Sequence, residues 1–234
     1  MPPSELLAQA VQSGRRRGRW KAWRAVEAQN VVSTLRLSDN DPARQDLLER
    51  ILEESKPPVP PAAVGLHYLL ATPFRYPPGR HGSRFRAWPE PGVLYGASER
   101  PTACAEMGYW RWRFARDSAG LGEIPAAAQT LFRFGVGGVG IDLAAAPLDQ
   151  WRPDWIAPDV YAATQALGRV AREAGVQFIC YQSVRDPEAG RCFAVLDAGA
   201  LRPGQPLERE TWYLTVTRRG AVWTREHERF VFEF

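Results

Sequence analysis

Residues 211–224 read TWYLTVTRRGAVWT, and this stretch decides the fold class. Apolar and polar side chains alternate on both sides of Arg218-Arg219-Gly220, which is the pattern of two half-buried strands joined by a hairpin turn. Other strand-like segments surround it without alternating with helices: residues 177–182, 191–196 and 228–232. We therefore predict an α+β fold with a mixed, mostly antiparallel β core and flanking helices, not a doubly wound sheet.

The middle of the chain supplies the helices that are expected to flank this sheet. Residues 100–116 and 159–174 are predicted to be helical from the spacing of their apolar side chains. A short strand is predicted at residues 93–95, and a longer one at residues 128–136. We expect Gly137-Gly138 to form a turn at the end of the longer strand.

The N-terminal region is predicted to be helical after a short leader. Residues 1–19 are expected to be a mobile leader, and Trp and Val side chains at helical spacing predict a helix over residues 20–37. Asp41 precedes Pro42, and this pair is typical of an N-cap followed by the first position of a second helix.

A proline-rich stretch at residues 56–61 ends this second helix and is typical of a stiff linker. We therefore divide the chain into a helical N-terminal extension with a basic leader, residues 1–56, and a main domain, residues 57–234. Five arginines and one lysine fall within residues 15–24. Such an arm suits an anionic partner, but no base-reading module follows it, so we expect no direct binding to nucleic acid.

The composition is that of an ordinary globular protein. The chain has 234 residues, of which 45% are hydrophobic and 24% charged, and its net charge is +4. This length can bury a sizeable core. Because no apolar run reaches about 18 residues, and the N-terminus lacks the apolar stretch of a signal peptide, we predict no membrane span and a cytoplasmic location.

The metal and nucleotide motifs that are easiest to detect are missing from the sequence. The three cysteines and three histidines are scattered and lack the spacing of metal ligands, so we predict neither a disulfide framework nor a metal site. We also find no P-loop and no G-x-G-x-x-G motif. Any catalytic or binding function must therefore use other residue types.

Glu106 is the first candidate. It lies among small and apolar residues in the predicted helix at 100–116. A carboxylate in such surroundings is costly unless it is paired or faces a cleft. Two interpretations stay open from this context: a structural salt bridge, with Arg86 or Arg113 as partner, or a functional carboxylate.

Two further segments carry polar side chains in turn-rich surroundings. Residues 75–86 hold four arginines among glycines, prolines and a serine, and guanidinium groups with exposed backbone N–H groups suit phosphate oxygens. Ser183 lies where a predicted strand meets a turn. Taken alone, residues 75–86 fit an ordinary basic surface loop, and Ser183 fits a common turn residue.

The order of these segments resembles that of the RES domain family, which is named for its Arg, Glu and Ser residues. The resemblance rests on Gly82-Ser83-Arg84-Phe85, on the block from Tyr95 to Glu106, and on Gln182-Ser183. It covers roughly residues 60–200. The block that ends at Glu106 is the most specific part.

The resemblance implies a fold similar to that of ADP-ribosyltransferase toxins and an enzyme that depletes NAD. Members of the family are toxins of toxin–antitoxin systems, and their partner is an Xre-type helix-turn-helix antitoxin. They cleave the nicotinamide–ribose bond by hydrolysis or by phosphorolysis. NAD is then a substrate, with inorganic phosphate as an optional second one, and no cofactor is implied.

The resemblance also implies roles for particular residues. Glu106, Arg84 and Tyr95 take the catalytic positions, and Ser183, Arg75, Ser83 and Arg86 are assigned to substrate binding. Many members have Gly-Gly-Arg-Trp-Asn where this chain has GSRFR at residues 82–86. Which of the three arginines holds the diphosphate therefore stays open at this stage.

Other interpretations of the sequence remain. An enzyme of the same fold could transfer ADP-ribose to a macromolecule, and a non-catalytic module could bind nucleic acid through the basic arm. The chain could also serve mainly as a structural partner, with its tryptophan-rich segments used for assembly. The sequence leaves homodimer formation open.

Overall fold

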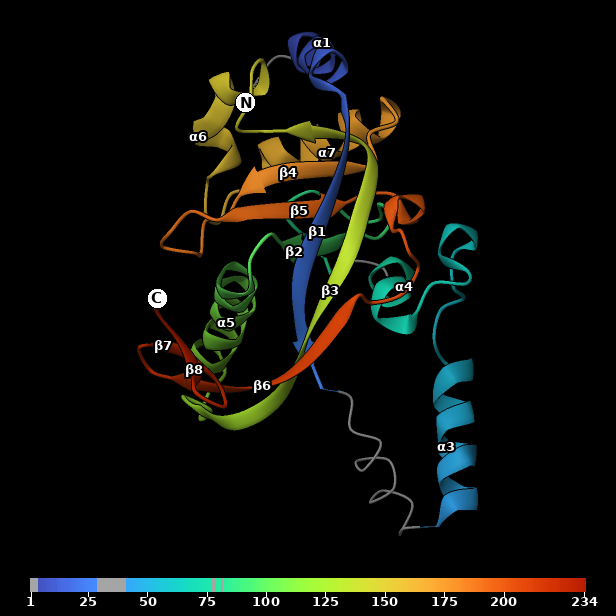
Figure 1. Cartoon of the computed structure of the whole chain (residues 1–234), viewed down its shortest axis with the longest axis vertical. Coiled ribbons are helices and arrows are strands. Elements are labelled where there is room, and N and C mark those ends of the chain that lie inside the picture. The colour runs from blue at the N-terminus through green and yellow to red at the C-terminus, as the bar shows by residue number, and fades with distance from the viewer. Residues whose placement is uncertain (1–3, 29–40, 77–78, 81) are drawn as a thin grey trace.

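The computed structural model describes residues 4–28, 41–76, 79–80 and 82–234. Its strands form one eight-stranded sheet in the order β1-β2-β5-β4-β3-β6-β7-β8 (Figure 1). The pairing of β3 with β4 is parallel and the other pairings are antiparallel. The strands are β1 Arg16–Glu27, β2 Leu94–Ala97, β3 Ile124–Asp142, β4 Phe178–Gln182, β5 Arg191–Val195, β6 Glu208–Thr217, β7 Gly220–Arg225 and β8 Glu228–Glu233. The predicted α+β fold with a mostly antiparallel core is confirmed.

Helices surround this sheet. The α-helices are α1 Ser4–Gly14, α3 Pro42–Glu54, α4 Tyr68–Arg75, α5 Arg100–Asp117, α6 Arg152–Trp155 and α7 Ala162–Glu173. The 3-10 helices are η1 Pro61–Ala63, η2 Leu148–Trp151 and η3 Ala198–Ala200. Figure 1 shows α5 beside the β7–β8 hairpin, α7 beside β4, and α3 extending from the lower end of the molecule.

Five strands pair in a closed circuit. Strand β1 pairs with β3 along its whole length, from Arg16 opposite Gly140 to Glu27 opposite Gln129. It also meets β2, where Trp23 lies opposite Ala97. Because β2, β5, β4 and β3 pair in turn, β1 closes the circuit. The N-terminal strand therefore lies directly beside β2 and the start of α5.

The N-terminal predictions are corrected here. The expected mobile leader is helix α1 over residues 4–14, with Leu7 and Val11 buried. The helix expected over residues 20–37 is wrong for residues 20–27, which belong to β1; residues 29–40 lie outside the described residues. The helical extension over residues 1–56 thus contains a long strand of the main sheet. The apolar spacing of this segment favours a helix locally, but pairing with twelve residues of β3 favours a strand more strongly.

The turn expected at Gly137-Gly138 is also wrong, because β3 continues through it. Backbone conformation and close approach explain Gly138 and the nearby Gly140, and Gly138 has a φ of 144°. A Cβ at Gly138 would collide with the Gln177 side chain, and one at Gly140 with the ring of Phe178. A strand that other groups approach so closely needs glycine in its interior.

Several local predictions are confirmed. The Asp41 carboxylate accepts hydrogen bonds from the backbone N–H groups of Ala43 and Arg44 at the start of α3. Helices α5 and α7 and strands β4, β5, β6, β7 and β8 match the predicted segments within a few residues. The hairpin turn lies between Thr217 and Gly220.

Small residues hold α5 close to the sheet. Ala103, Cys104 and Ala105 are buried in one core cluster with Trp212 and Trp223. A Cβ at Gly108 would collide with the side chain of Ala221. This close packing fixes the height of α5 above the strands, and with it the position of Glu106.

Candidate active site

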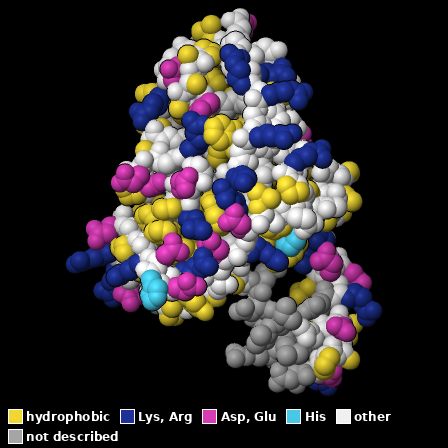
Figure 2. Space-filling view, viewed as in Figure 1, with side chains coloured by type: hydrophobic (Ala, Val, Ile, Leu, Met, Phe, Trp, Pro, Cys, Tyr) yellow, Lys and Arg dark blue, Asp and Glu magenta, His cyan; other side chains and the backbone are white. Residues whose placement is uncertain are grey.

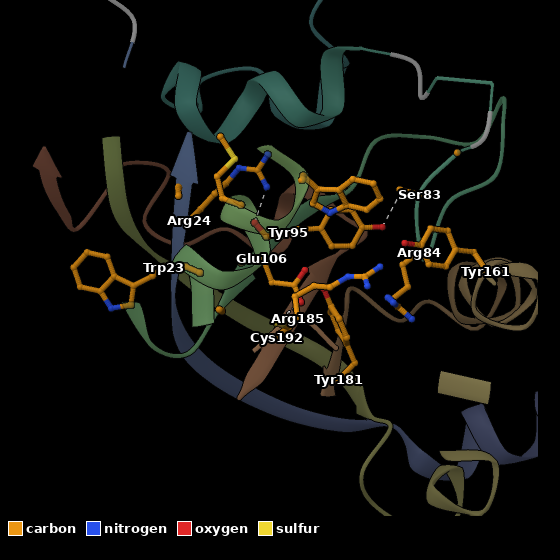
Figure 3. Close-up of a pocket in the computed structure, with 17 residues that line it drawn as sticks. Trp23, Arg24, Ser83, Arg84, Tyr95, Glu106, Tyr161, Tyr181, Arg185 and Cys192 are labelled. Carbon is orange, nitrogen blue, oxygen red and sulfur yellow. Dashed lines mark hydrogen bonds between the residues drawn. The ribbon is translucent and has the colours of Figure 1, made fainter. Parts of the chain in front are cut away.

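A cavity of about 410 Å³ lies where β1, β2 and α5 meet. This volume is in the range of small-molecule sites. Its polar and aromatic lining includes Arg24, Ser83, Arg84, Tyr95, Glu106, Tyr161, Tyr181 and Arg185 (Figure 3). In that view Tyr95 lies in the middle, with Arg24 on one side and Arg84 and Tyr161 on the other.

A short hydrogen bond joins Glu106 to Ser183. The Ser183 hydroxyl lies 2.6 Å from Glu106 Oε1. The same Ser183 oxygen accepts the backbone N–H groups of Arg185 and Asp186, at 3.2 and 3.0 Å. Since a hydroxyl has one hydrogen, these two acceptances leave Ser183 as the donor to the carboxylate.

The turn that carries Ser183 is itself held in place. Asp186 accepts the Thr102 hydroxyl at 2.7 Å and the backbone N–H of Gly190 at 3.2 Å. Thr102 belongs to the first turn of α5, four residues before Glu106. The carboxylate and its donor are therefore connected twice, once directly and once through Asp186.

Burial raises the pKa of the Glu106 carboxyl. The hydrogen bond from Ser183 and the positive charges of Arg84 and Arg185 act in the opposite direction, because they favour the ionised form. The Cys192 thiol lies 3.9 Å from the same carboxylate oxygen. The site is thus built around one desolvated carboxylate.

Tyr95 connects β2 with the loop at residues 82–86. Its hydroxyl lies 2.8 Å from the Ser83 hydroxyl and accepts the backbone N–H of Phe85 at 3.1 Å. Burial raises the pKa of the phenol, which keeps it protonated. The ring lines the cavity and offers an apolar face to a ligand.

Arg84 and Arg185 form the positively charged wall. Arg84 is 8% exposed and donates to the carbonyl oxygens of Trp155 and Ala157, at 3.0 and 2.9 Å. Arg185 donates to the carbonyl of Pro158 at 2.6 Å, and its guanidinium lies 3.6 Å from the ring centre of Tyr109. Both guanidinium groups are fixed by the backbone at the end of α6 and just after it.

Two predicted site residues lie elsewhere. Arg75 donates to Glu53 at 2.6 Å and also to the carbonyl of Pro57, and it does not line the cavity. Arg86 donates to the carbonyl of Tyr76 at 3.3 Å and does not line it either. The structure brings together Glu106, Arg84, Tyr95, Ser83 and Ser183.

The structure adds residues that the sequence argument missed. Trp23 and Arg24 reach the cavity from β1, and Tyr161 lies under Arg84, with its ring centre 4.9 Å from the guanidinium carbon. Arg24 is the last residue of the basic arm at residues 15–24. Its burial follows from the pairing of β1 with β3, which no local pattern reveals.

Neither a cluster of metal ligands nor a membrane-spanning helix occurs in the described part of the chain. There, no three His, Cys, Asp or Glu side chains are grouped as metal ligands. Among the same residues, no helix has the length and apolar character needed to cross a bilayer.

Comparison with known proteins defines the class. The model of the RES domain family matches residues 59–217, which is more than half of the chain. The chain therefore belongs to the RES domain family, as the order of its motifs indicated. A comparison with curated proteins gives no match.

A solved structure shares the fold. It is the crystal structure of the M. tuberculosis MbcT–MbcA toxin–antitoxin complex, with a TM-score of 0.52 at 15% sequence identity. The match covers 91% of this chain and 92% of the other. At this identity the similarity concerns the fold.

Proposed function

We propose that this protein is a toxin that depletes NAD by cleaving the bond between nicotinamide and ribose. The observation that supports this most directly is the buried Glu106 carboxylate, which accepts the Ser183 hydroxyl at 2.6 Å beside an aromatic wall and arginine side chains. Membership of the RES domain family supports the same activity.

The reaction needs stabilisation of positive charge more than it needs acid catalysis. Nicotinamide leaves as a neutral molecule from a cationic precursor, so no proton has to be supplied to it. The ribose passes through an oxocarbenium-like state, as in other glycosyl transfers. A fixed carboxylate next to the ribose lowers the energy of that state, and we assign this role to Glu106.

The other residues bind and orient the dinucleotide. The Tyr95 ring provides a face on which nicotinamide stacks. Ser183 holds the carboxylate and fixes its direction toward the ribose. We assign Arg84 and Ser83 to holding the diphosphate or an attacking phosphate, because the Arg84 guanidinium keeps donors beyond those it gives to backbone carbonyls.

The ADP-ribosyl group is then taken by water or by inorganic phosphate. With water, NAD gives nicotinamide, ADP-ribose and a proton. With phosphate, it gives nicotinamide and ADP-ribose 1-phosphate. Either reaction removes NAD, and the proposal places this activity in the cytoplasm.

An antitoxin partner belongs to the same proposal. The fold is shared with a structure solved as a toxin–antitoxin complex, and the family resemblance implies an Xre-type helix-turn-helix protein as the partner. Such a partner has to close the cavity, because free activity would exhaust the NAD of the cell that makes it. Co-expression of such a partner should then restore growth of cells that produce this protein.

The test is NAD loss by the purified protein, measured with and without millimolar phosphate beside Glu106→Gln. We expect loss of NAD and release of nicotinamide for the wild type, with ADP-ribose or its 1-phosphate identifying the acceptor. Mass added to a macromolecule would instead indicate ADP-ribosyl transfer. No NAD loss by folded protein free of bound inhibitor would contradict the proposal.

A further inference from the structure

Arg24 differs from the other arginines of the cavity in how it is bonded. Its Nη1 donates to the carbonyl oxygen of Tyr95 at 2.7 Å. Within the described residues this is its single hydrogen bond, and no carboxylate there forms a salt bridge with it. Its Nε is buried without a hydrogen-bond partner. An unpaired buried donor costs free energy, so it calls for an explanation.

The position of Arg24 is fixed by the backbone on both sides. It lies opposite Phe132 in the long β1–β3 pairing, and the neighbouring Trp23 lies opposite Ala97 of β2. A Cβ at Gly96 would approach the carbonyl oxygen of Trp23 and collide with the ring of Phe134. Glycine at this position therefore lets β2 approach β1 closely enough for the Tyr95 carbonyl oxygen to accept a hydrogen bond from the Arg24 guanidinium.

Arg24 remains a cation in this place. Burial lowers its pKa to about 10, which still leaves it protonated at neutral pH. In the described residues, Glu106 is the one carboxylate that lines the cavity, and it is already bonded to Ser183. Three arginines, Arg24, Arg84 and Arg185, line the cavity with that carboxylate. Arg185 is also paired with Asp159 at 3.1 Å, whereas Arg24 and Arg84 have no salt bridge among the described residues. The excess of positive charge favours an anionic ligand.

We propose that Arg24 binds phosphate oxygens of a ligand in this cavity, from the side of Tyr95 opposite Arg84 (Figure 3). The planar guanidinium suits a phosphate group, and the Nη donors beyond the one given to Tyr95 are those that the ligand would take. Arg24 precedes the residues matched by the family model, so no family motif assigns it this role. The identity of the ligand rests on the proposed function.

Two sources could supply the phosphate oxygens: the diphosphate of the dinucleotide, or inorganic phosphate that attacks the ribose. Binding of ADP-ribose and of inorganic phosphate, each measured by calorimetry, separates them. The proteins are the wild type, Arg24→Met, and Arg19→Met as the control. Arg19 lies on the same strand, is exposed, and does not line the cavity.

We expect Arg24→Met to weaken binding of at least one of the two ligands by about tenfold or more, and Arg19→Met to change neither. Weaker binding of ADP-ribose alone identifies the diphosphate. Weaker binding of inorganic phosphate identifies the attacking anion. Equal affinity of Arg24→Met and wild type for both ligands would overturn the proposal, as would a wild type that binds neither.

Thermal unfolding first shows whether Arg24→Met is folded. If it is not, Arg24→Lys takes its place: it keeps the charge and loses the planar fork, so we expect a loss of about threefold or more for the same ligand. Unchanged binding by folded Arg24→Lys would then reject the role. Because no turnover is needed, a wild type that binds but leaves NAD intact would contradict the proposed function alone.

Discussion

The two sides of the cavity are organised in different ways. On the side of α5 and β4, hydrogen bonds converge: Thr102, Asp186 and Ser183 form a chain that ends on Glu106. On the side of the loop at residues 75–86, the arginine side chains point to different places. Of the three candidates Arg75, Arg84 and Arg86, Arg84 alone lines the cavity. Such a chain, ending on one Glu106 oxygen, is the arrangement expected where a negative charge must be held in position before the reaction begins.

The largest effect is expected on the converging side. Glu106→Gln keeps the shape and an acceptor for Ser183 but removes the negative charge, so we expect NAD turnover to fall roughly 100- to 1,000-fold. Steady-state NAD consumption gives the value. Stability should not suffer, because a buried carboxyl with a raised pKa is destabilising when ionised. A variant with normal turnover would remove Glu106 from the mechanism.

The diverging side is tested by comparing Arg84→Ala with Arg86→Ala. Arg84 is buried and lines the cavity, whereas Arg86 donates to the carbonyl of Tyr76 outside it. We expect kcat/KM for NAD to fall about 10- to 100-fold for the first variant and to change less than about threefold for the second. The reverse order would show that the family's arginine position falls on Arg86.

These two sides were not equally accessible from the sequence. Glu106 stood out because a carboxylate among small, apolar helix residues is costly, and Ser183 followed it in the order of a known family. The arginines of the loop share composition and neighbours, so nothing local separates Arg84 from Arg75. Their difference is tertiary: Arg75 pairs with Glu53 of α3, and Arg84 is held by carbonyls at the end of α6 and just after it.

Strand β1 shows a second limit. Its Trp and Val spacing fits a helix, and its basic residues fit a solvated arm. The pairing that makes it a strand involves glycines more than 100 residues away, such as Gly137 opposite Arg19. Locally, a Gly-Gly pair indicates a turn, so the prediction at Gly137-Gly138 is wrong. Both errors come from one long-range pairing.

A smaller effect is expected for Ser183→Ala, which removes the donor to Glu106 without removing the charge. We expect kcat to fall about tenfold. Its pH profile carries more information. A hydrogen bond to the ionised carboxylate lowers the pKa, so its loss raises the pKa of Glu106 further above the usual value for glutamate. The acid limb of activity should therefore move to higher pH.

That shift separates an effect on Glu106 from a general loosening of the site. If Ser183→Ala lowers kcat while the acid limb stays where it is in the wild type, Ser183 acts on the substrate and not on the carboxylate. Glu106→Gln is the matched control, since its residual activity should lose this limb altogether.

Tyr95 joins the two sides, and the smallest effect is expected there. The hydroxyl holds Ser83 and the backbone of Phe85, and the ring lines the cavity. Tyr95→Ala removes both, and we expect KM for NAD to rise roughly threefold to tenfold through lost stacking.

Tyr95→Phe keeps the ring and loses the link to the loop. If Tyr95→Phe raises KM as much as Tyr95→Ala, the hydroxyl and the placement of the loop matter, and stacking on the ring does not. A normal KM for Tyr95→Phe with a raised KM for Tyr95→Ala assigns the effect to the ring, and leaves the two sides of the cavity energetically independent.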